Sequence, residues 1–217
     1  MISRPSPNFG PRRDGLKPEI VVIHYTAMQS VAAAADRLCD PKTEVSAHYL
    51  IDRFGEVIQL VDERQRAWHA GAGEWRGQTD INSRSIGIEL DNTGKHPFPE
   101  PQMQKLETLL QGVIQRWSIE PHNVIGHSDM APGRKIDPGP KFDWQRLAHM
   151  GLASPTGFGD SKQPADAVVF RQAARNAGYT ADVDDETLLA AVRLRHRPFA
   201  IGPLVAADIA ALDVDGR

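Results

Sequence analysis

The sequence has few of the features that would place it outside the ordinary globular proteins. Cys39 is the single cysteine among 217 residues, so no intramolecular disulfide can form and any metal site must use other ligands. No run of eighteen apolar residues occurs, so no segment is suited to span a membrane as a helix. The first twenty residues also lack the apolar stretch of a signal peptide. These absences predict a protein that is neither membrane-spanning nor exported by a classical signal.

The sequence also has no large excess of charge of one sign. The formal net charge is −3, with basic and acidic residues interspersed along the chain, so no basic patch argues for nucleic-acid binding. Hydrophobic residues make up 41% and charged residues 24% of the chain, which is typical of a globular protein. The length allows one domain of average size and a small appendage.

The first part of the chain shows α/β patterning. The run EIVVIHYTA is rich in β-branched residues and predicts a buried strand with His24 near its end. The alanine-rich segment that follows predicts a helix with Ser30 as its N-cap. The runs SAHYLID and EVIQLVD predict two strands of a hairpin, in which Gly55 can adopt a positive φ.

Further elements follow as far as about residue 150. The stretch SIGIEL predicts a strand that places Gly87 and Glu89 on the face opposite its apolar residues. Apolar residues recur at three and four positions between 100 and 117, which predicts an amphipathic helix packed on a sheet. NVIGH predicts a short strand that ends at His127, and FDWQRLA predicts a closing helix with Asp143 near its start.

The last part of the chain predicts a separate all-α unit. Residues 151–165 are rich in glycine, proline, serine and aspartate, which is the composition of a linker. Three segments beyond it have helical spacing, at 165–177, 185–196 and 203–212. About fifty residues bury little apolar surface, so we expect a three-helix appendage over 166–217 that is docked on or tethered to the first domain.

Two histidines and one aspartate are candidate metal ligands. His24 and His127 each end a predicted strand, and Asp137 follows on a loop stiffened by prolines and glycines. Two imidazoles and one carboxylate from separate elements match the three protein ligands of a catalytic Zn²⁺ site. From spacing alone, surface histidines and a solvated turn remain alternatives.

A carboxylate and an ammonium group complete a possible active site. Glu89 lies in a strand otherwise made of small and apolar residues, where charged residues are rare, and Lys135 lies two positions before Asp137. Glu89 could act as a general base toward water, and Lys135 could stabilise an oxyanion. Together these groups indicate a hydrolase, although a solvent-facing glutamate and an accidental charge pair are the alternatives.

The segment AWHAGAGEWRGQTDINSRSIGIE contains two tryptophans in a region with little secondary-structure signal. Aromatic residues on long loops suit sugar stacking or peptide anchoring. Capping of the core by Trp68 or Trp75 is the alternative.

These motifs together carry a resemblance to a known family. VVIHYTA, SAHYLID, GEVIQLV, AWHAG, NSRSIGIEL and VIGHSDMAPGRKIDPGP resemble, in order and spacing, the zinc-dependent N-acetylmuramoyl-L-alanine amidases of the amidase_2 family. The resemblance covers about residues 18 to 150. Ala47 and Glu89 stand where the phage-lysozyme and recognition-protein branches tend to have a tyrosine and no glutamate, which favours the AmpD/AmiD group.

The resemblance implies a fold and roles for individual residues. The fold would be a mixed central β-sheet flanked by helices, with residues 1–150 as the zinc amidase domain and a peptidoglycan-binding-like three-helix domain at the end. Zn²⁺ would be held by His24, His127 and Asp137. Glu89 would be the acid/base and Lys135 the transition-state stabiliser. Three further residues are expected to bind substrate, namely Trp68, His69 and Asn82.

The resemblance also implies the reaction, which is hydrolysis of the amide between N-acetylmuramic acid, or its 1,6-anhydro form, and L-alanine of the stem peptide. A muropeptide receptor without catalysis and a zinc peptidase acting within the stem are the alternatives. The expected partners are peptidoglycan fragments, and the expected state is a monomer. We expect a cytoplasmic location, with a periplasmic or outer-membrane location as the alternative if an export signal was removed or missed.

Overall fold

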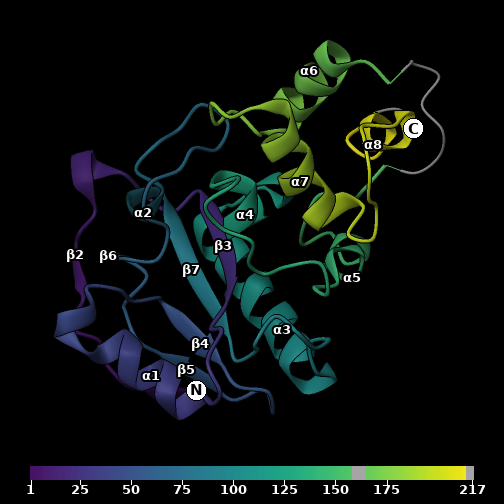
Figure 1. Ribbon diagram of the computed structural model, residues 1–217. Coiled ribbons are helices and arrows are strands. Elements are labelled where there is room, and N and C mark those ends of the chain that lie inside the picture. The colour runs from purple at the N-terminus through teal and green to yellow at the C-terminus, as the bar shows by residue number, and fades with distance from the viewer. Residues whose placement is uncertain (158–164, 214–217) are drawn as a thin grey trace.

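A mixed β-sheet forms the centre of the molecule in the computed structural model (Figure 1), which describes residues 1–157 and 165–213. Six strands lie in the order β1, β5, β4, β7, β3, β8. Strands β4 and β5 pair antiparallel, and the other neighbours pair parallel. The mixed sheet confirms the predicted fold class. The strands of this sheet are β1 (Ile2–Ser3), β3 (Ile20–Tyr25), β4 (Tyr49–Ile51), β5 (Val57–Gln59), β7 (Ser85–Leu90) and β8 (Val124–Gly126).

A second, two-stranded sheet pairs β2 (Phe9–Pro11) with β6 (Gln65–Ala67) in antiparallel register. It leads directly into the segment from Trp68 onward that carries several predicted site residues. The hairpin between β4 and β5 turns at Gly55, whose φ of 86° confirms the predicted left-handed conformation.

The two central strands of the large sheet show which side chains lie on each of its faces. Strands β3 and β7 run parallel, with His24 beside Glu89 in the register. Side chains alternate between faces along a strand, so the isoleucines of β7 enter one hydrophobic core while Gly87 and Glu89 face the other side, as predicted. The predicted catalytic carboxylate and one predicted metal ligand therefore share a face on adjacent strands.

Helix α3 (Glu100–Trp117) covers the more apolar face of the sheet and has the bounds that the sequence predicts. Its buried side chains include Leu106, Leu110 and Val113, which pack in the same core as the isoleucines of β7. Burial of such side chains stabilises the fold by roughly 1.5–3 kcal/mol each.

The remaining helices of the first 150 residues are short. Ser30 caps α1 (Val31–Cys39) by accepting a hydrogen bond from the amide of Ala33 at 3.2 Å, as predicted. Asp143 caps α5 (Trp144–His149) in the same way by accepting from the amide of Arg146 at 3.0 Å. The other short helices are α2 (Ile81–Arg84) and α4 (His127–Met130), with 3₁₀ turns at Arg13–Gly15, Pro41–Thr43 and Pro121–Asn123.

Three C-terminal helices, α6 (Ala167–Ala177), α7 (Asp185–His196) and α8 (Ala206–Ala210), pack on one another, and α7 lies beside α4 (Figure 1). Their apolar side chains, among them Phe170 and Leu188, share one core with Val22 and Met130 of the first unit. The third helix is shorter than the predicted 203–212. Part of the predicted linker, 158–164, lies outside the described residues, and the division into domains remains a prediction.

A buried polar contact joins the two units. Asp129 of α4 accepts hydrogen bonds from the Tyr179 hydroxyl at 2.8 Å and from Arg195 at 3.0 Å. Arg195 also stacks on Trp144, with its guanidinium carbon 4.1 Å from the ring centroid. These contacts favour the docked arrangement over the tethered one.

Among the described residues, no helix combines the length and the apolarity that crossing a bilayer demands. The cytoplasmic location and the monomeric state remain predictions.

Candidate functional site

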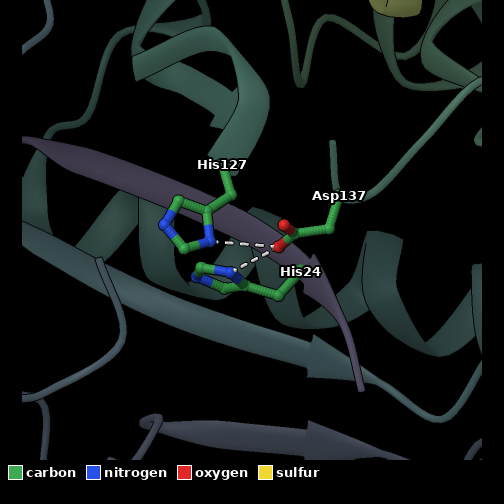
Figure 2. Close-up of side chains that lie close together, drawn as sticks. All are labelled: His24, His127 and Asp137. Atoms are coloured by element: carbon green, nitrogen blue, oxygen red, sulfur yellow. Dashed lines mark hydrogen bonds and ion pairs between the residues drawn. The ribbon is translucent and has the colours of Figure 1, made fainter. Parts of the chain in front are cut away.

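The structure brings together the three predicted metal ligands (Figure 2). Oδ2 of Asp137 lies 2.8 Å from Nδ1 of His24 and 3.1 Å from Nδ1 of His127. The three candidate ligand atoms lie within 4.8 Å of one another, and all three residues are buried. Two imidazole nitrogens and a carboxylate oxygen at this spacing can hold a metal ion.

The topology explains why these residues meet. Strands β3 and β8 are parallel neighbours with Ile23 beside Gly126, so His24 and His127 both follow at the same end of the sheet. The loop after α4 then returns, because the amide of Ser128 donates to the carbonyl of Asp137 at 2.9 Å. Gly126 permits this approach, since a Cβ at that position would lie 2.7 Å from Pro138.

Electrostatics of the cluster favour a cation. Burial, and then the neighbouring His127, lower the pKa of His24 to about 4, although Asp137 opposes the shift. Burial alone would raise the pKa of Asp137, but its close contacts with the rings of His127 and His24 outweigh burial and hold that pKa far below its usual value. A neutral imidazole and an ionised carboxylate are the forms that bind a metal.

Glu89 lies in the same pocket, half-buried. Its Oε2 is buried and has no hydrogen-bond partner within the part of the chain that the structure describes. Burial, and then the charge of Asp137, raise the pKa of Glu89 to about 8, while Lys135 opposes the shift. A carboxyl group with a strongly perturbed pKa in a pocket is a candidate for proton transfer.

The cluster opens into a cavity of about 530 Å³. Lys135, Trp68 and His69 line this cavity together with Glu89 and the three candidate ligands. Asn82 does not line it. Its Oδ1 instead accepts hydrogen bonds from the amides of His69 at 3.0 Å and Ala70 at 2.9 Å. A role of Asn82 in direct substrate contact therefore stays a prediction, and the contact that the structure gives it is with the loop behind the pocket.

The two tryptophans of the aromatic segment have different places. Trp75 is buried in the core, where its ring meets that of Tyr179 edge to face at 5.2 Å. Trp68 is half-buried and faces the cavity. The core-capping alternative therefore applies to Trp75.

Arg134 is a residue of the site that the sequence reasoning missed. Its guanidinium donates to the carbonyl of Ala70 at 2.7 Å and to that of Ala72. It thereby ties the segment after His69 to the loop that carries Lys135 and Asp137. Its place beside Lys135 in the sequence was the available signal, but its partners are backbone carbonyls more than sixty positions away.

Fold and site together define a hydrolase of the amidase class. Residues 14–140 match the Amidase_2 family, described as N-acetylmuramoyl-L-alanine amidase. The chain belongs to this family of enzymes, which confirms the predicted family and enzyme class.

Curated relatives agree with this assignment. The chain is 42% identical over 155 residues to the N-acetylmuramoyl-L-alanine amidase AmiD of Escherichia coli, a match that covers 63% of this chain and 54% of AmiD. It is 37% identical over 163 residues to the 1,6-anhydro-N-acetylmuramyl-L-alanine amidase AmpD of Enterobacter cloacae, a match that covers 67% of this chain and 87% of AmpD. The sequence match thus spans about half of the length of full-length AmiD and most of that of AmpD.

Solved structures extend the likeness to the C-terminal helices. E. coli AmiD in complex with anhydro-N-acetylmuramic acid-L-Ala-D-gamma-Glu-L-Lys superposes with a TM-score of 0.82 at 33% identity, over 97% of this chain and 91% of AmiD. AmpDh3 of Pseudomonas aeruginosa in complex with anhydromuramic pentapeptide has a TM-score of 0.80 at 32% identity, over 97% of this chain and 94% of AmpDh3. An AmpD derivative covers 70% of this chain with a TM-score of 0.64.

Proposed function

We propose that the protein hydrolyses the amide between N-acetylmuramic acid, or its 1,6-anhydro form, and L-alanine of peptidoglycan stem peptides, in the turnover or recycling of the wall. The observation that carries the proposal is the convergence of His24, His127 and Asp137 beside Glu89 in one cavity. The likeness to amidases solved with anhydromuramyl peptides supports it, and favours it over a receptor or a peptidase acting within the stem.

Zn²⁺ is the metal that we propose for this site. Two nitrogens and one oxygen form a ligand set that zinc accepts, and three protein ligands leave a position open for reaction. The three atoms already lie within 4.8 Å of one another, so the residues fit the ion. When bound, Zn²⁺ would activate water and polarise the scissile carbonyl.

Glu89 is the proposed general acid and base. Glu89 pairs with His24 in the register of β3 and β7, which supports a role next to the candidate metal ligands, and its Oε2 has no hydrogen-bond partner in the described chain. Oε2 can accept a proton from the attacking water and return it to the leaving nitrogen of L-alanine.

Lys135 is the proposed stabiliser of the oxyanion. Lys135 lines the cavity two residues before Asp137, and among the described residues none forms a hydrogen bond or ion pair with its ammonium. An unshared positive charge there can stabilise the negative charge that develops on the carbonyl oxygen as water attacks.

The cavity rim suits an anionic muropeptide. The exposed Arg37 of α1 also lines the cavity, and Trp68 provides an aromatic surface for a sugar or peptide. Stem peptides carry carboxylates, which guanidinium groups bind well. We propose that Trp68 contacts the substrate and that soluble fragments enter this cavity.

Product analysis tests the function. The zinc-loaded protein is incubated separately with a soluble anhydromuramyl peptide and with polymeric peptidoglycan, and the products are identified by mass spectrometry. We expect anhydro-N-acetylmuramic acid and a free peptide that begins with L-alanine, and we expect a chelator to stop the reaction. Cleavage inside the peptide would establish a peptidase, and binding without cleavage would establish a receptor.

A further inference from the structure

A pair of residues, His69 and Ala70, lies directly behind both candidate metal-binding histidines. Nδ1 of His69 is 3.1 Å from Nε2 of His24, and the carbonyl of Ala70 is 2.8 Å from Nε2 of His127. We propose that this dipeptide, held by Asn82, fixes the protons of His24 and His127 on Nε2, so that both rings present Nδ1 to the metal. The inference rests on the proposed metal site and gives His69 and Asn82 positioning roles.

Proton positions on the His24 side follow from a chain of hydrogen bonds that begins at Ser85. The Ser85 hydroxyl has one proton, and it donates that proton to the carbonyl of Ile81 at 2.5 Å. Nε2 of His69, which is 3.2 Å from the same hydroxyl, must then be the donor to it.

A neutral His69 with its proton on Nε2 has a lone pair on Nδ1. Nε2 of His24 therefore donates to that lone pair. Nδ1 of His24, which faces Asp137 in Figure 2, then keeps its own lone pair for the metal.

On the His127 side the argument is shorter. A carbonyl oxygen can only accept, so Nε2 of His127 carries the proton that it donates to Ala70. Nδ1 then has the lone pair and faces Asp137. Arg134 donates to the same carbonyl at 2.7 Å and so holds the acceptor in place. Both ligands thus obtain the same proton arrangement from neighbouring residues of one loop.

Asn82 fixes that loop. Its single Oδ1 accepts from the amides of both His69 and Ala70, at 3.0 and 2.9 Å, and the side chain is buried. Gly87 provides the space, since a Cβ there would lie 2.4 Å from the nearest atom of the His69 ring. This accounts for the glycine that precedes Glu89 by two positions on the same face of β7.

Partners of this kind matter for affinity. Metal-binding histidines commonly donate their second ring nitrogen to a carbonyl, carboxylate or other acceptor, and loss of that partner typically weakens metal binding about 10–100-fold. A residue that only bound substrate would change KM and leave metal affinity unaltered.

The test measures Zn²⁺ affinity without substrate, by competition with a chromophoric chelator. His69→Leu removes the acceptor, whereas the similarly sized His69→Asn restores an oxygen near the place of Nδ1. We expect the dissociation constant of His69→Leu to rise about 10–100-fold, and that of His69→Asn to stay within a few-fold of wild type. Asn82→Ala and Gly87→Ala, which leave His69 in the chain but release or displace it, should weaken binding in the same direction.

NMR of the zinc-loaded protein provides a second readout that does not depend on turnover. Long-range ¹⁵N–¹H correlations should show His24, His69 and His127 with their protons on Nε2, and His69→Leu should change the pattern of His24. Thermal unfolding of each variant checks the fold.

Wild-type Zn²⁺ affinity in His69→Leu, with only KM raised, would overturn the positioning role and leave the amidase proposal intact. Failure of the wild-type protein to bind Zn²⁺ would instead overturn the metal site and this inference together.

Discussion

His24 and Asp137 are 113 positions apart in the chain, and their side chains meet at 2.8 Å between Nδ1 and Oδ2. The contact joins the end of a central strand to a proline-rich loop that returns to it, and His127 completes the cluster from the neighbouring strand end. The three ligands come from separate elements, so the cluster forms only when β3, β8 and the loop after α4 are all folded.

Removal of one ligand should remove the metal. We expect His127→Ala to lose stoichiometric Zn²⁺ and amidase activity together, because two ligands bind zinc far more weakly than three. Metal content after dialysis and the rate of muropeptide hydrolysis are the measurements. His149→Ala, at the exposed end of α5, serves as the control and should match wild type. Full zinc occupancy with normal turnover in His127→Ala would show that the ligand assignment is wrong.

Substitution of the proposed proton carrier should separate chemistry from metal binding. Glu89→Gln preserves the shape of the side chain but cannot take a proton from water, so kcat should fall about 10²–10⁴-fold. Zinc content and thermal stability should stay close to those of wild type. The exposed Glu56→Gln is the matched control. A rate within a few-fold of wild type would exclude Glu89 from the mechanism.

The ammonium of Lys135 should act on the rate more than on binding. Lys135→Met keeps the aliphatic length and removes the charge, and loss of one oxyanion-stabilising group costs about 10²–10³ in kcat. Steady-state kinetics on a soluble muropeptide measure both constants. An increase confined to KM would assign Lys135 to substrate binding. Lys141→Met, beyond the loop, is the control for loss of a positive charge.

The junction with the C-terminal helices should contribute to global stability. Arg195 and Asp129 form a buried ion pair, with side-chain exposures of 4% and 1%. Arg195→Met leaves the Asp129 charge without that partner and should reduce the free energy of unfolding by about 3–5 kcal/mol. Tyr179→Phe removes one hydrogen bond to the same carboxylate and should cost about 1.5–3 kcal/mol.

Urea denaturation of these two variants, with the exposed Gln172→Ala of α6 as control, gives the comparison. An unchanged transition in Arg195→Met would mean that the ion pair with Asp129 contributes little to the stability of the fold.

Acid should weaken the hydrogen bonds that the Glu63 carboxylate accepts from Arg116 and Trp117 of α3. Burial opposes ionisation of Glu63, but hydrogen bonds from Arg116, Tyr49 and Trp117 outweigh it and lower the pKa of Glu63. A lowered pKa in the folded state means that the ionised carboxylate stabilises the fold above its unfolded pKa of about 4.3. That contribution is lost as the pH falls below this value toward the folded pKa.

The stability difference between wild type and Glu63→Gln should therefore be largest near neutral pH and should shrink as the pH falls below about 4.3. Urea denaturation of both proteins at pH 7, 5, 4 and 3 measures it, with the exposed Glu120→Gln as control. A difference that is independent of pH would assign the effect to packing rather than to charge.

The amino-acid sequence by itself determined the local elements. The period of apolar residues defined α3 from Glu100 to Trp117, and alternation in SIGIEL placed Glu89 opposite the core. Ser30 and Asp143 marked helix starts because their side chains accept hydrogen bonds from nearby backbone amides. All of these depend on interactions within a few residues, which a sequence pattern displays directly.

The sequence predicted only part of the candidate site. Histidines at strand ends indicated a metal, and the motif resemblance named its ligands, but neither showed what the remaining nitrogens of those ligands contact. Only the tertiary structure decided that His69 faces His24, that Asn82 holds the loop and not the cavity, and that Asp129 binds Tyr179 and Arg195. These contacts span 12 to 66 positions, and their hydrogen-bond geometry depends on how whole elements pack, which no local pattern of residues encodes.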